Sequence, residues 1–261
     1  MPRPPLTGLT VLRADALAPS MRRVVLGGDG FAEVAGRWQG FTDSYVKLAF
    51  AVPGSDDPVL RTYTVRRLDP QAGELWIDIV THGDDGLAGP WAQRVRPGEE
   101  ISLRGPGGAY RPDPEADHHL FVGDEAALPA IAASLESLVP GQRATAFVEV
   151  DGPADEQPVD SAGDVEIIWL HRAPAPAGST DLLDRAVRAW DWPAGRVQAF
   201  VHGESALLKT VRPYLAKDRA LPRVDLSVSA YWRRGETEEG FRAWKQAERA
   251  CGDEPMWRPG R

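Results

Sequence analysis

The hydrophobic pattern of the sequence changes once, at the Pro- and Asp-rich segment Arg111–Asp117, and this change constrains the fold more than any other feature. Before it, Leu6–Arg104 holds about six short runs rich in β-branched and aromatic residues, which are typical of antiparallel strands in a small barrel. After it, strand-like runs alternate with helical ones, which predicts a mostly parallel sheet covered by helices. We therefore predict a two-domain β + α/β protein, with a barrel domain at 1–113 and an α/β domain at 114–261.

The expected elements follow from the runs and the turns between them. In the first domain we expect two strands within Leu6–Leu26, divided at Leu17-Ala18-Pro19, and further strands at Ser44–Val52, Pro58–Leu68, Glu74–Thr81 and Glu99–Leu103. In the second domain we expect strands at His119–Val122, Ala144–Val150, Val165–Leu170, Val197–His202 and Val224–Tyr231, and helices at Ala126–Val139, Thr180–Trp190, Ser205–Lys217 and Thr237–Ala250, the last with Thr237 as its N-cap.

Composition excludes several classes of protein. A formal net charge of −8 argues against nucleic acid or anionic membrane as the main partner. The single Cys251 excludes an internal disulfide and a cysteine-ligated iron–sulfur cluster, and the five histidines lack zinc-binding spacing. No apolar run approaches the ~18 residues of a membrane span, and the N-terminus lacks the apolar core of a signal peptide. We expect a soluble, cytoplasmic monomer without a bound metal or membrane insertion.

The stretch Arg61–Arg66 lies in one predicted strand and carries side chains suited to a flavin. Alternate residues of a strand share a face, so the two expected sets are Arg61, Tyr63 and Val65 on one face and Thr62, Thr64 and Arg66 on the other. A tyrosine ring can stack on a planar cofactor, a threonine can bond a ring heteroatom, and arginines can hold phosphate bidentately. The alternative is an edge strand with solvated arginines.

The pattern Arg-x-Tyr-Thr-x-Arg resembles the flavin-binding signature of the siderophore-interacting proteins, which are ferric-siderophore reductases of the ferredoxin–NADP reductase superfamily. Three further stretches match in the same order: His82–Trp91, Gly123–Ile131 and Tyr231–Gly235. The resemblance runs from Arg13 to Trp244, which is nearly the whole chain. It implies an FAD-binding barrel followed by an α/β domain of the nicotinamide-binding type.

The Gly-rich stretch His82–Trp91 is expected to lead into a short helix at Trp91–Arg94, whose free amides and dipole could bind phosphate. A structural loop is the alternative. The resemblance implies that this stretch holds the flavin pyrophosphate, with His82 close to the cofactor. The residues carried over as FAD-binding are Arg61, Tyr63, Thr64, Arg66, Asp78, Val80, His82, Gly86, Ala88 and Trp91. For Asp78, a solvated strand residue is the alternative.

The stretch Gly123–Ile131 ends the first strand of the second domain, where open α/β sheets bind ligands. It lacks a Gly-x-Gly-x-x-Gly fingerprint, and Asp124 and Glu125 place negative charge near an expected pyrophosphate. Helix capping would explain these acids equally well. The resemblance implies a threonine where this chain has Ala126. We therefore expect weak use of NADPH.

Two more residues of the second domain complete the nicotinamide-side set with Gly123 and Asp124. Arg172 follows a predicted strand and could grip the 2′-phosphate of NADPH, although a solvated loop arginine is the alternative. Ser205 follows another strand, at a position that the resemblance places opposite the nicotinamide. Its alternative role is that of an N-cap.

The resemblance implies a flavin-dependent ferric-siderophore reductase with FAD as cofactor, NAD(P)H or reduced ferredoxin as electron donor, and a ferric siderophore as substrate. No catalytic acid or base is expected, because the flavin carries the redox chemistry. A large anionic ferric chelate would dock on an open basic patch, for which we name Lys47, Arg233 and Arg234; solvated charges are the alternative. The rival functions are another flavin-dependent NAD(P)H oxidoreductase and a non-catalytic siderophore-binding protein.

Overall fold

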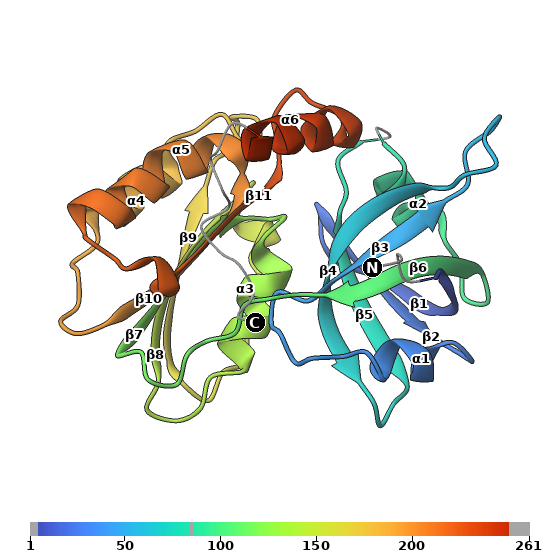
Figure 1. Ribbon diagram of the computed structural model, residues 1–261, viewed down its shortest axis with the longest axis horizontal. Coiled ribbons are helices and arrows are strands. Elements are labelled where there is room, and N and C mark those ends of the chain that lie inside the picture. The colour runs from blue at the N-terminus through green and yellow to red at the C-terminus, as the bar shows by residue number, and fades with distance from the viewer. Residues whose placement is uncertain (1–4, 84–85, 251–261) are drawn as a thin grey trace. The chain divides into compact units, whose positions relative to one another are not determined.

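In the computed structural model, which describes residues 5–83 and 86–250, the chain forms two compact units (Figure 1). The first unit ends at Arg111 and the second begins at Pro112. The division therefore falls at the Pro- and Asp-rich segment where the hydrophobic pattern changes. None of the helices in the described part of the chain is long and apolar enough to cross a membrane.

The first unit is a closed antiparallel barrel with the strand order β1-β2-β5-β4-β3-β6. Its strands are β1 (Thr7–Ala18), β2 (Met21–Gly27), β3 (Tyr45–Phe50), β4 (Val59–Asp69), β5 (Glu74–Val80) and β6 (Glu100–Gly107), and its helices are α1 (Phe31–Ala35) and α2 (Ala88–Arg94). The six predicted strands are all present. The five-residue helix α1 was not predicted, because a single turn has no helical periodicity to detect.

The barrel core follows the period of two that the sequence carries. On β5, Leu75, Ile77 and Ile79 are fully buried, and they pack with Val46 and Leu48 of β3. The residues between them, Trp76 and Asp78, lie on the opposite face, so β5 presents one apolar face to the interior. This alternation fixes which side chains of β3, β4 and β5 are available on the outside of the barrel.

The second unit is a five-stranded parallel sheet in the order β11-β10-β7-β8-β9. Its strands are β7 (His118–Asp124), β8 (Arg143–Val150), β9 (Asp164–His171), β10 (Val197–Glu204) and β11 (Leu226–Trp232). Its α-helices are α3 (Leu128–Glu136), α4 (Leu182–Ala189), α5 (Ser205–Pro213) and α6 (Glu238–Ala250). The chain runs outward from β7 to β9 and then returns to β10, so the strand order switches between β7 and β10.

Helices cover both faces of this sheet. Helices α4 and α5 lie on one face, and α3 lies on the other (Figure 1). Val187 of α4 and Val211 of α5 join a buried cluster with Val122 and Val201 from the sheet. Parallel strands buried on both faces explain the near-continuous apolar runs of this half of the sequence.

Three details differ from or refine the sequence prediction. Helix α5 ends at Pro213 and a π-helical turn, Tyr214–Asp218, follows, so the predicted helix to Lys217 is not one regular α-helix. Proline lacks the N–H of an α-helical hydrogen bond, which accounts for the change. Thr237 is confirmed as an N-cap, because its Oγ1 accepts the Gly240 N–H at 3.2 Å. Cys251 lies outside the described residues.

Candidate functional site

Strand β4 carries the Arg61–Arg66 stretch, and its pairing with β3 shows which way the side chains point. Tyr63 lies opposite the buried Val46, and it packs against the barrel core while staying partly exposed. Thr62 lies opposite Lys47, on the outer face. Cross-strand partners share a face, so the predicted alternation between the two sets of residues is present in this stretch.

A β-bulge follows directly and changes the direction of the next side chains. Val65 pairs with Ile77 and Arg67 pairs with Trp76, which leaves Arg66 as the extra residue of the bulge. Arg66 and Arg67 therefore both lie on the outer face, where strict alternation would separate them. The guanidinium of Arg67 lies 5.1 Å from the Trp76 ring centroid.

Arg66 belongs to a compact charged cluster with Asp78 and Arg23. Arg23 binds Asp78 bidentately, with Nε and Nη2 each donating at 2.7 Å, and Arg66 Nε lies 3.9 Å from the same carboxylate. The Asp78 side chain is 1% exposed, so the solvated alternative for this residue is wrong. Arg23 was missed by the sequence analysis, although a charged residue inside a predicted strand was an available signal. The Asp78 carboxylate therefore lies between two guanidinium groups.

The segment before α2 has a backbone suited to an anion. Gly83 and Gly86 adopt positive φ angles of 57° and 80°, which favour glycine. Helix α2 begins at Ala88, three residues before the predicted start, because Pro90 fits the first turn of a helix. His82 is exposed beside this segment. The early start places the amides of Ala88 and its neighbour in the first turn, where they lack intrahelical partners.

The first unit carries donors and aromatic rings of the kinds that an anionic flavin dinucleotide requires. Arg61 and Arg66 supply guanidinium donors, and α2 supplies N-terminal amides. Tyr63 supplies a partly exposed ring whose other side packs on the core. Trp91 is held edge-on against Phe50 at 5.6 Å between ring centroids. This set of donors and rings fits FAD. Of the other predicted residues, Thr64 is buried and Val80 is the last residue of β5.

Lys47 lies on the outer face of β3 next to a second cation that sequence analysis did not identify. It pairs in register with Arg104 of β6, since their neighbours Leu48 and Leu103 both point into the core. The Nε of Arg104 is buried without a hydrogen-bond partner. Like charges directly across two strands repel, so an anion at this position would relieve the repulsion. The signal in the sequence was only a cation inside a predicted strand.

In the second unit, Asp124 fills the point where the strand order switches. Its Oδ1 accepts the Ala126 N–H at 3.0 Å, and its Oδ2 accepts the Glu204 N–H at 2.9 Å and the Trp232 Nε1–H at 2.7 Å. The close approach requires glycine at 203, where a Cβ would lie 2.8 Å from this carboxylate. Burial, reinforced by the Glu125 carboxylate, raises the pKa of Asp124 to about 7, although the three N–H donors favour its ionised form.

The predicted capping role of the two acids is wrong. Helix α3 begins at Leu128 with Ala127 as its N-cap, and no side chain caps it. Asp124 instead joins the ends of three strands. Gly123, which precedes it, has no space for a side chain, because a Cβ would lie 2.6 Å from both the Ala127 Cβ and the His202 carbonyl oxygen.

Glu125 forms a short ion pair with Arg172, and both side chains are less than 9% exposed. Asp151 lies 3.7 Å from the same guanidinium. Arg172 is therefore neither a solvated loop arginine nor an exposed guanidinium. Burial raises the pKa of Glu125, and the positive charge of Arg172 opposes that rise. The predicted role of Arg172 at a 2′-phosphate would require this pair to open.

Ser205 begins α5, but the N-cap is the preceding Glu204. The Glu204 carboxylate accepts the Ala206 N–H, and the Ser205 hydroxyl donates to Glu204 Oε1 at 3.0 Å. The predicted N-cap role of Ser205 is therefore wrong by one residue. Both side chains are buried. The Ala206 N–H, one of the first-turn amides of α5 that could bind a ligand, is thus already bonded within the chain.

The predicted substrate arginines follow β11. Arg234 is exposed, and its backbone N–H donates to Glu204 Oε1 at 3.0 Å. The guanidinium of Arg233 lies 5.3 Å from the ring centroid of Trp244 in α6. These contacts hold the backbone of one arginine and the side chain of the other.

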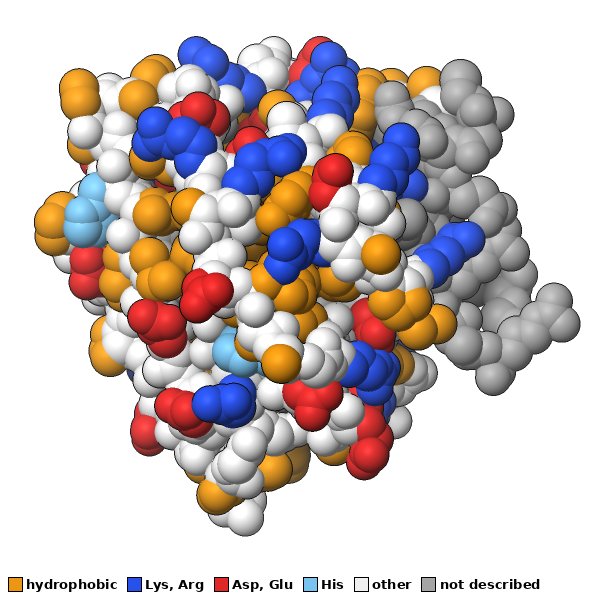
Figure 2. All heavy atoms as spheres, turned by 90° about the vertical axis from the view of Figure 1, so that its left-hand side faces the viewer, with side chains coloured by type: hydrophobic (Ala, Val, Ile, Leu, Met, Phe, Trp, Pro, Cys, Tyr) orange, Lys and Arg blue, Asp and Glu red, His pale blue; other side chains and the backbone are white. Residues whose placement is uncertain are grey.

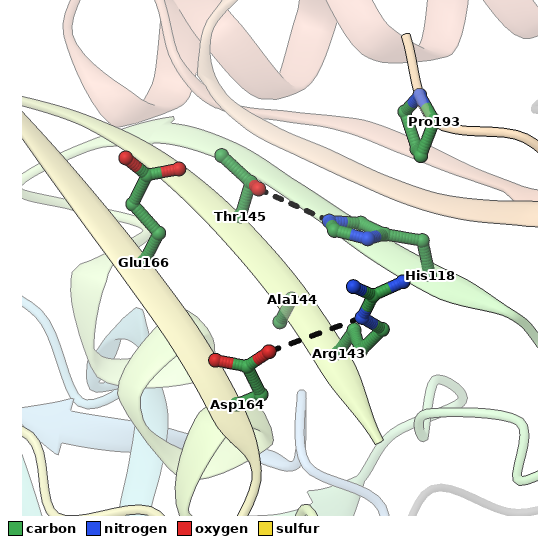
Figure 3. A pocket seen from close by; sticks show the side chains of 7 residues that line it. All are labelled: His118, Arg143, Ala144, Thr145, Asp164, Glu166 and Pro193. Atoms are coloured by element: carbon green, nitrogen blue, oxygen red, sulfur yellow. Dashed lines mark hydrogen bonds and ion pairs between the residues drawn. The ribbon is translucent and has the colours of Figure 1, made fainter. Parts of the chain in front are cut away.

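A hollow of about 360 Å³ lies at the opposite edge of the sheet (Figure 3). His118, Arg143 and Asp164 line it, and they are the first residues of β7, β8 and β9. His118 Nε2 bonds the Thr145 hydroxyl at 3.0 Å, and Arg143 pairs with Asp164 at 3.8 Å. Open α/β sheets bind ligands at the carboxyl ends of their strands, so this hollow at the amino ends is not the candidate site.

The described surface shows no feature that adds to the candidate site. Figure 2 shows acidic and basic side chains interspersed on one face, with apolar side chains between them, as on an ordinary solvated surface. Within residues 5–83 and 86–250, no group of three or more His, Cys, Asp or Glu side chains could hold a metal ion.

Comparison with known proteins places both units in one family. The family model described as siderophore-interacting protein matches residues 116–235. The family model described as siderophore-interacting FAD-binding domain matches residues 10–58 and 51–110. The chain is 43% identical over 271 residues to an uncharacterised protein of Mycobacterium tuberculosis, covering 93% of this chain and 95% of that protein. It is 36% identical over 189 residues to the ferric vibriobactin reductase ViuB of Vibrio cholerae, covering 70% of this chain and 68% of that protein.

Solved structures show the same architecture. A siderophore utilization protein from T. fusca is 39% identical and superimposes with a TM-score of 0.80, covering 90% of this chain and 96% of that one. A ferredoxin–NADP⁺ reductase from Plasmodium falciparum is 9% identical with a TM-score of 0.67, covering 87% of this chain and 96% of that one. The second likeness shows the fold alone. The predicted barrel and α/β fold of the ferredoxin reductase type is confirmed.

The raised pKa of Asp124 makes a prediction about stability. The folded state holds a proton that the unfolded state releases above its pKa of 3.8, so stability from this group falls as pH rises from about 4 to about 7. Asp124→Asn lacks this dependence. From pH 4 to pH 7, the free energy of unfolding of the unmodified protein should therefore fall relative to that of the variant. The fall should be at least about 1.4 kcal/mol, which corresponds to a shift of one pKa unit. Urea denaturation at several pH values measures it. The exposed Asp160→Asn is the control, and a constant difference for Asp124→Asn would contradict the assignment.

Proposed function

The chain belongs to the siderophore-interacting protein family, and from that premise we propose that it is an FAD-dependent ferric-siderophore reductase. It would release iron by reducing chelated Fe(III) to Fe(II) with electrons from reduced ferredoxin or NAD(P)H. The match to an FAD-binding domain over the first unit supports the cofactor. The identity to a ferric vibriobactin reductase over most of both chains supports the reaction.

The observation that carries the proposal is the arrangement on β4. Tyr63 packs on the barrel core with part of its ring exposed, and Arg61 shares its face two residues earlier. Arg66, on the outer face, lies with Arg23 beside the buried Asp78 carboxylate. A ring platform flanked by guanidiniums suits a flavin with phosphate groups. The early amides of α2 add donors for the second phosphate that distinguishes FAD from FMN.

The protein residues have positioning roles in this proposal. FAD, when bound, supplies the one-electron chemistry that chelated Fe(III) requires. Tyr63 would orient the ring system, and Arg61 and Arg66 would neutralise the phosphates. No side chain has to act as a general acid or base, because electron transfer to iron needs no bond to be cleaved in the chelator. Fe(II) binds hard anionic oxygen ligands less tightly than Fe(III), so reduction favours release of the metal.

The switch point of the second unit argues for a protein donor of electrons. Asp124 occupies the crevice between β7 and β10, and Glu204 caps the helix that follows. The Asp124 side chain fills the position where related folds bind a pyrophosphate, and the Glu204 carboxylate would repel one. Arg172 is already neutralised by Glu125. We therefore infer that reduced ferredoxin is a better donor than NADPH.

Turnover with different donors tests the function. The purified protein should contain flavin and reduce a ferric tris-catecholate faster with reduced ferredoxin than with NADPH. Appearance of Fe(II) in the presence of a ferrous-specific chelator measures the rate. Binding of the ferric complex without reduction by any donor would support a siderophore-binding protein instead. Reduction of other acceptors alone would support a different flavin-dependent oxidoreductase. A micromolar or tighter Michaelis constant for NADPH would contradict the inferred donor.

The flavin site makes a second prediction. Loss of a charge-assisted contact between arginine and phosphate should weaken binding by about 1.5–3 kcal/mol, or about 10- to 100-fold. Arg61→Ala and Tyr63→Ala should therefore be purified with much less flavin and with an unchanged circular dichroism spectrum. Tyr63→Phe keeps the ring and should keep the flavin. Arg67→Ala, on the same strand but stacked on Trp76, is the matched control. Full flavin occupancy in both alanine variants would refute the site.

The paired cations on the barrel make a third prediction. Lys47→Gln and Arg104→Gln should each weaken the use of ferric tris-catecholate several-fold at low salt. The effect should shrink at high salt, because the Debye length falls from ~10 Å at 0.1 M to ~3 Å at 1 M. The Michaelis constant measures it, with the exposed Lys209→Gln as a control for net charge. Equal losses with a neutral ferric trihydroxamate would show that these residues do not act through charge.

A further inference from the structure

We propose that two buried carboxylates, Asp124 and Glu204, position Arg233 to bind an anionic ferric chelate. Asp124 binds the side chain of Trp232, the residue before this arginine. Glu204 binds the backbone N–H of Arg234, the residue after it. The inference rests on the proposed function, because Arg233 is one of the residues that we expect to bind the ferric siderophore. It makes Asp124 a positioning residue and not a nicotinamide-binding one.

The residue before Arg233 is fixed by its side chain. The indole Nε1–H of Trp232 donates to Asp124 Oδ2 at 2.7 Å, and the same oxygen accepts the Glu204 N–H at 2.9 Å. Asp124 is 4% exposed, so water does not compete for these contacts. Hydrogen bonds to a buried carboxylate are among the stronger ones in proteins. The end of β11 is therefore tied to the ends of β7 and β10 through one side chain.

The residue after Arg233 is fixed by its backbone. The Arg234 N–H donates to Glu204 Oε1 at 3.0 Å, and that oxygen also accepts the Ser205 hydroxyl at 3.0 Å. The other carboxylate oxygen of Glu204 accepts the Ala206 N–H. Glu204 is therefore held rigidly as the N-cap of α5 while it holds the chain beyond β11. Arg233 lies between two anchored neighbours.

A third contact orients the side chain of Arg233 itself. Its guanidinium lies 5.3 Å from the Trp244 ring centroid, and its carbonyl oxygen accepts the Glu236 N–H at 3.1 Å. Stacking on an aromatic ring restricts the rotamers of arginine and leaves its N–H groups pointing along the plane of the guanidinium. A side chain ordered in advance loses less conformational entropy when an anion binds.

The same contacts explain why acidic residues stand where related folds bind a nucleotide. Two of the amides that a phosphate could use at the end of β10 and the start of α5 are those of Glu204 and Ala206. Both are bonded to carboxylates of this chain. These two amide groups are thus engaged by the carboxylates that hold the segment carrying Arg233.

The test removes one anchor while leaving Arg233 in place. Trp232→Phe keeps an aromatic ring but lacks the N–H that Asp124 accepts. Affinity is measured by equilibrium dialysis of ferric tris-catecholate against the purified protein, without an electron donor. We expect Trp232→Phe to raise the dissociation constant about three- to tenfold. In the Arg233→Ala background the same substitution should have no further effect, because its consequence passes through the arginine.

The controls separate positioning from general damage. Trp190→Phe makes the same chemical change in an aromatic cluster with His118 and Phe147 and should leave the dissociation constant unchanged. A neutral ferric trihydroxamate should bind the Trp232→Phe variant as it binds the unmodified protein. Should Trp232→Phe not fold, Glu204→Gln provides the second variant. It keeps the shape of the side chain but removes the charge and replaces one accepting oxygen with an NH2 group, and we expect the same rise in the dissociation constant.

The outcomes distinguish this inference from the proposed function. If the unmodified protein does not bind ferric tris-catecholate, the proposed function is contradicted in its choice of an anionic substrate. If it does bind, an unchanged affinity in Arg233→Ala overturns the inference. The inference is also overturned if Trp232→Phe leaves the affinity unchanged. It is overturned as well if Trp232→Phe weakens binding equally in the presence and in the absence of Arg233.

Discussion

The carboxylate of Asp124 is the interaction on which the second unit depends. It is fully buried, and it accepts N–H groups from the ends of β10 and β11 and from the turn that follows β7. A buried carboxylate is tolerated only where donors replace its water, so the three elements must meet at this point. Gly123 and Gly203 supply the space that this meeting requires. The arrangement determines what can bind at the switch point of the sheet.

In the first unit, the buried Asp78 carboxylate is surrounded by arginine side chains and not by backbone and indole N–H groups. Asp78 is engaged by Arg23 and approached by Arg66, and the bulge in β4 directs the second arginine to it. Lys47 and Arg104 form another pair of cations across two strands. Cations gathered at these two places on the barrel wall would suit phosphate groups and anionic chelates. The protein as a whole is acidic, so this charge is a local feature.

The two units offer opposite environments to a dinucleotide. Cationic and aromatic groups of the barrel fit a flavin dinucleotide, whereas the acids of the sheet disfavour a second dinucleotide. The buried pair of Glu125 and Arg172 adds to this, because its charges already satisfy each other. A donor that does not need the switch point is consistent with such a surface. The proposed positioning of Arg233 gives the acids a constructive role.

The sequence by itself determined the order and type of nearly all the strands and helices and the family, because period, turn residues and ordered motifs are local signals. It also identified Arg61, Tyr63 and Lys47 as candidates. Only the tertiary structure could reveal that Asp124 joins three strand ends, that Arg23 shares Asp78 and that Arg104 lies opposite Lys47. These contacts join residues distant in the chain through strand register and a bulge, and no local pattern encodes either of them.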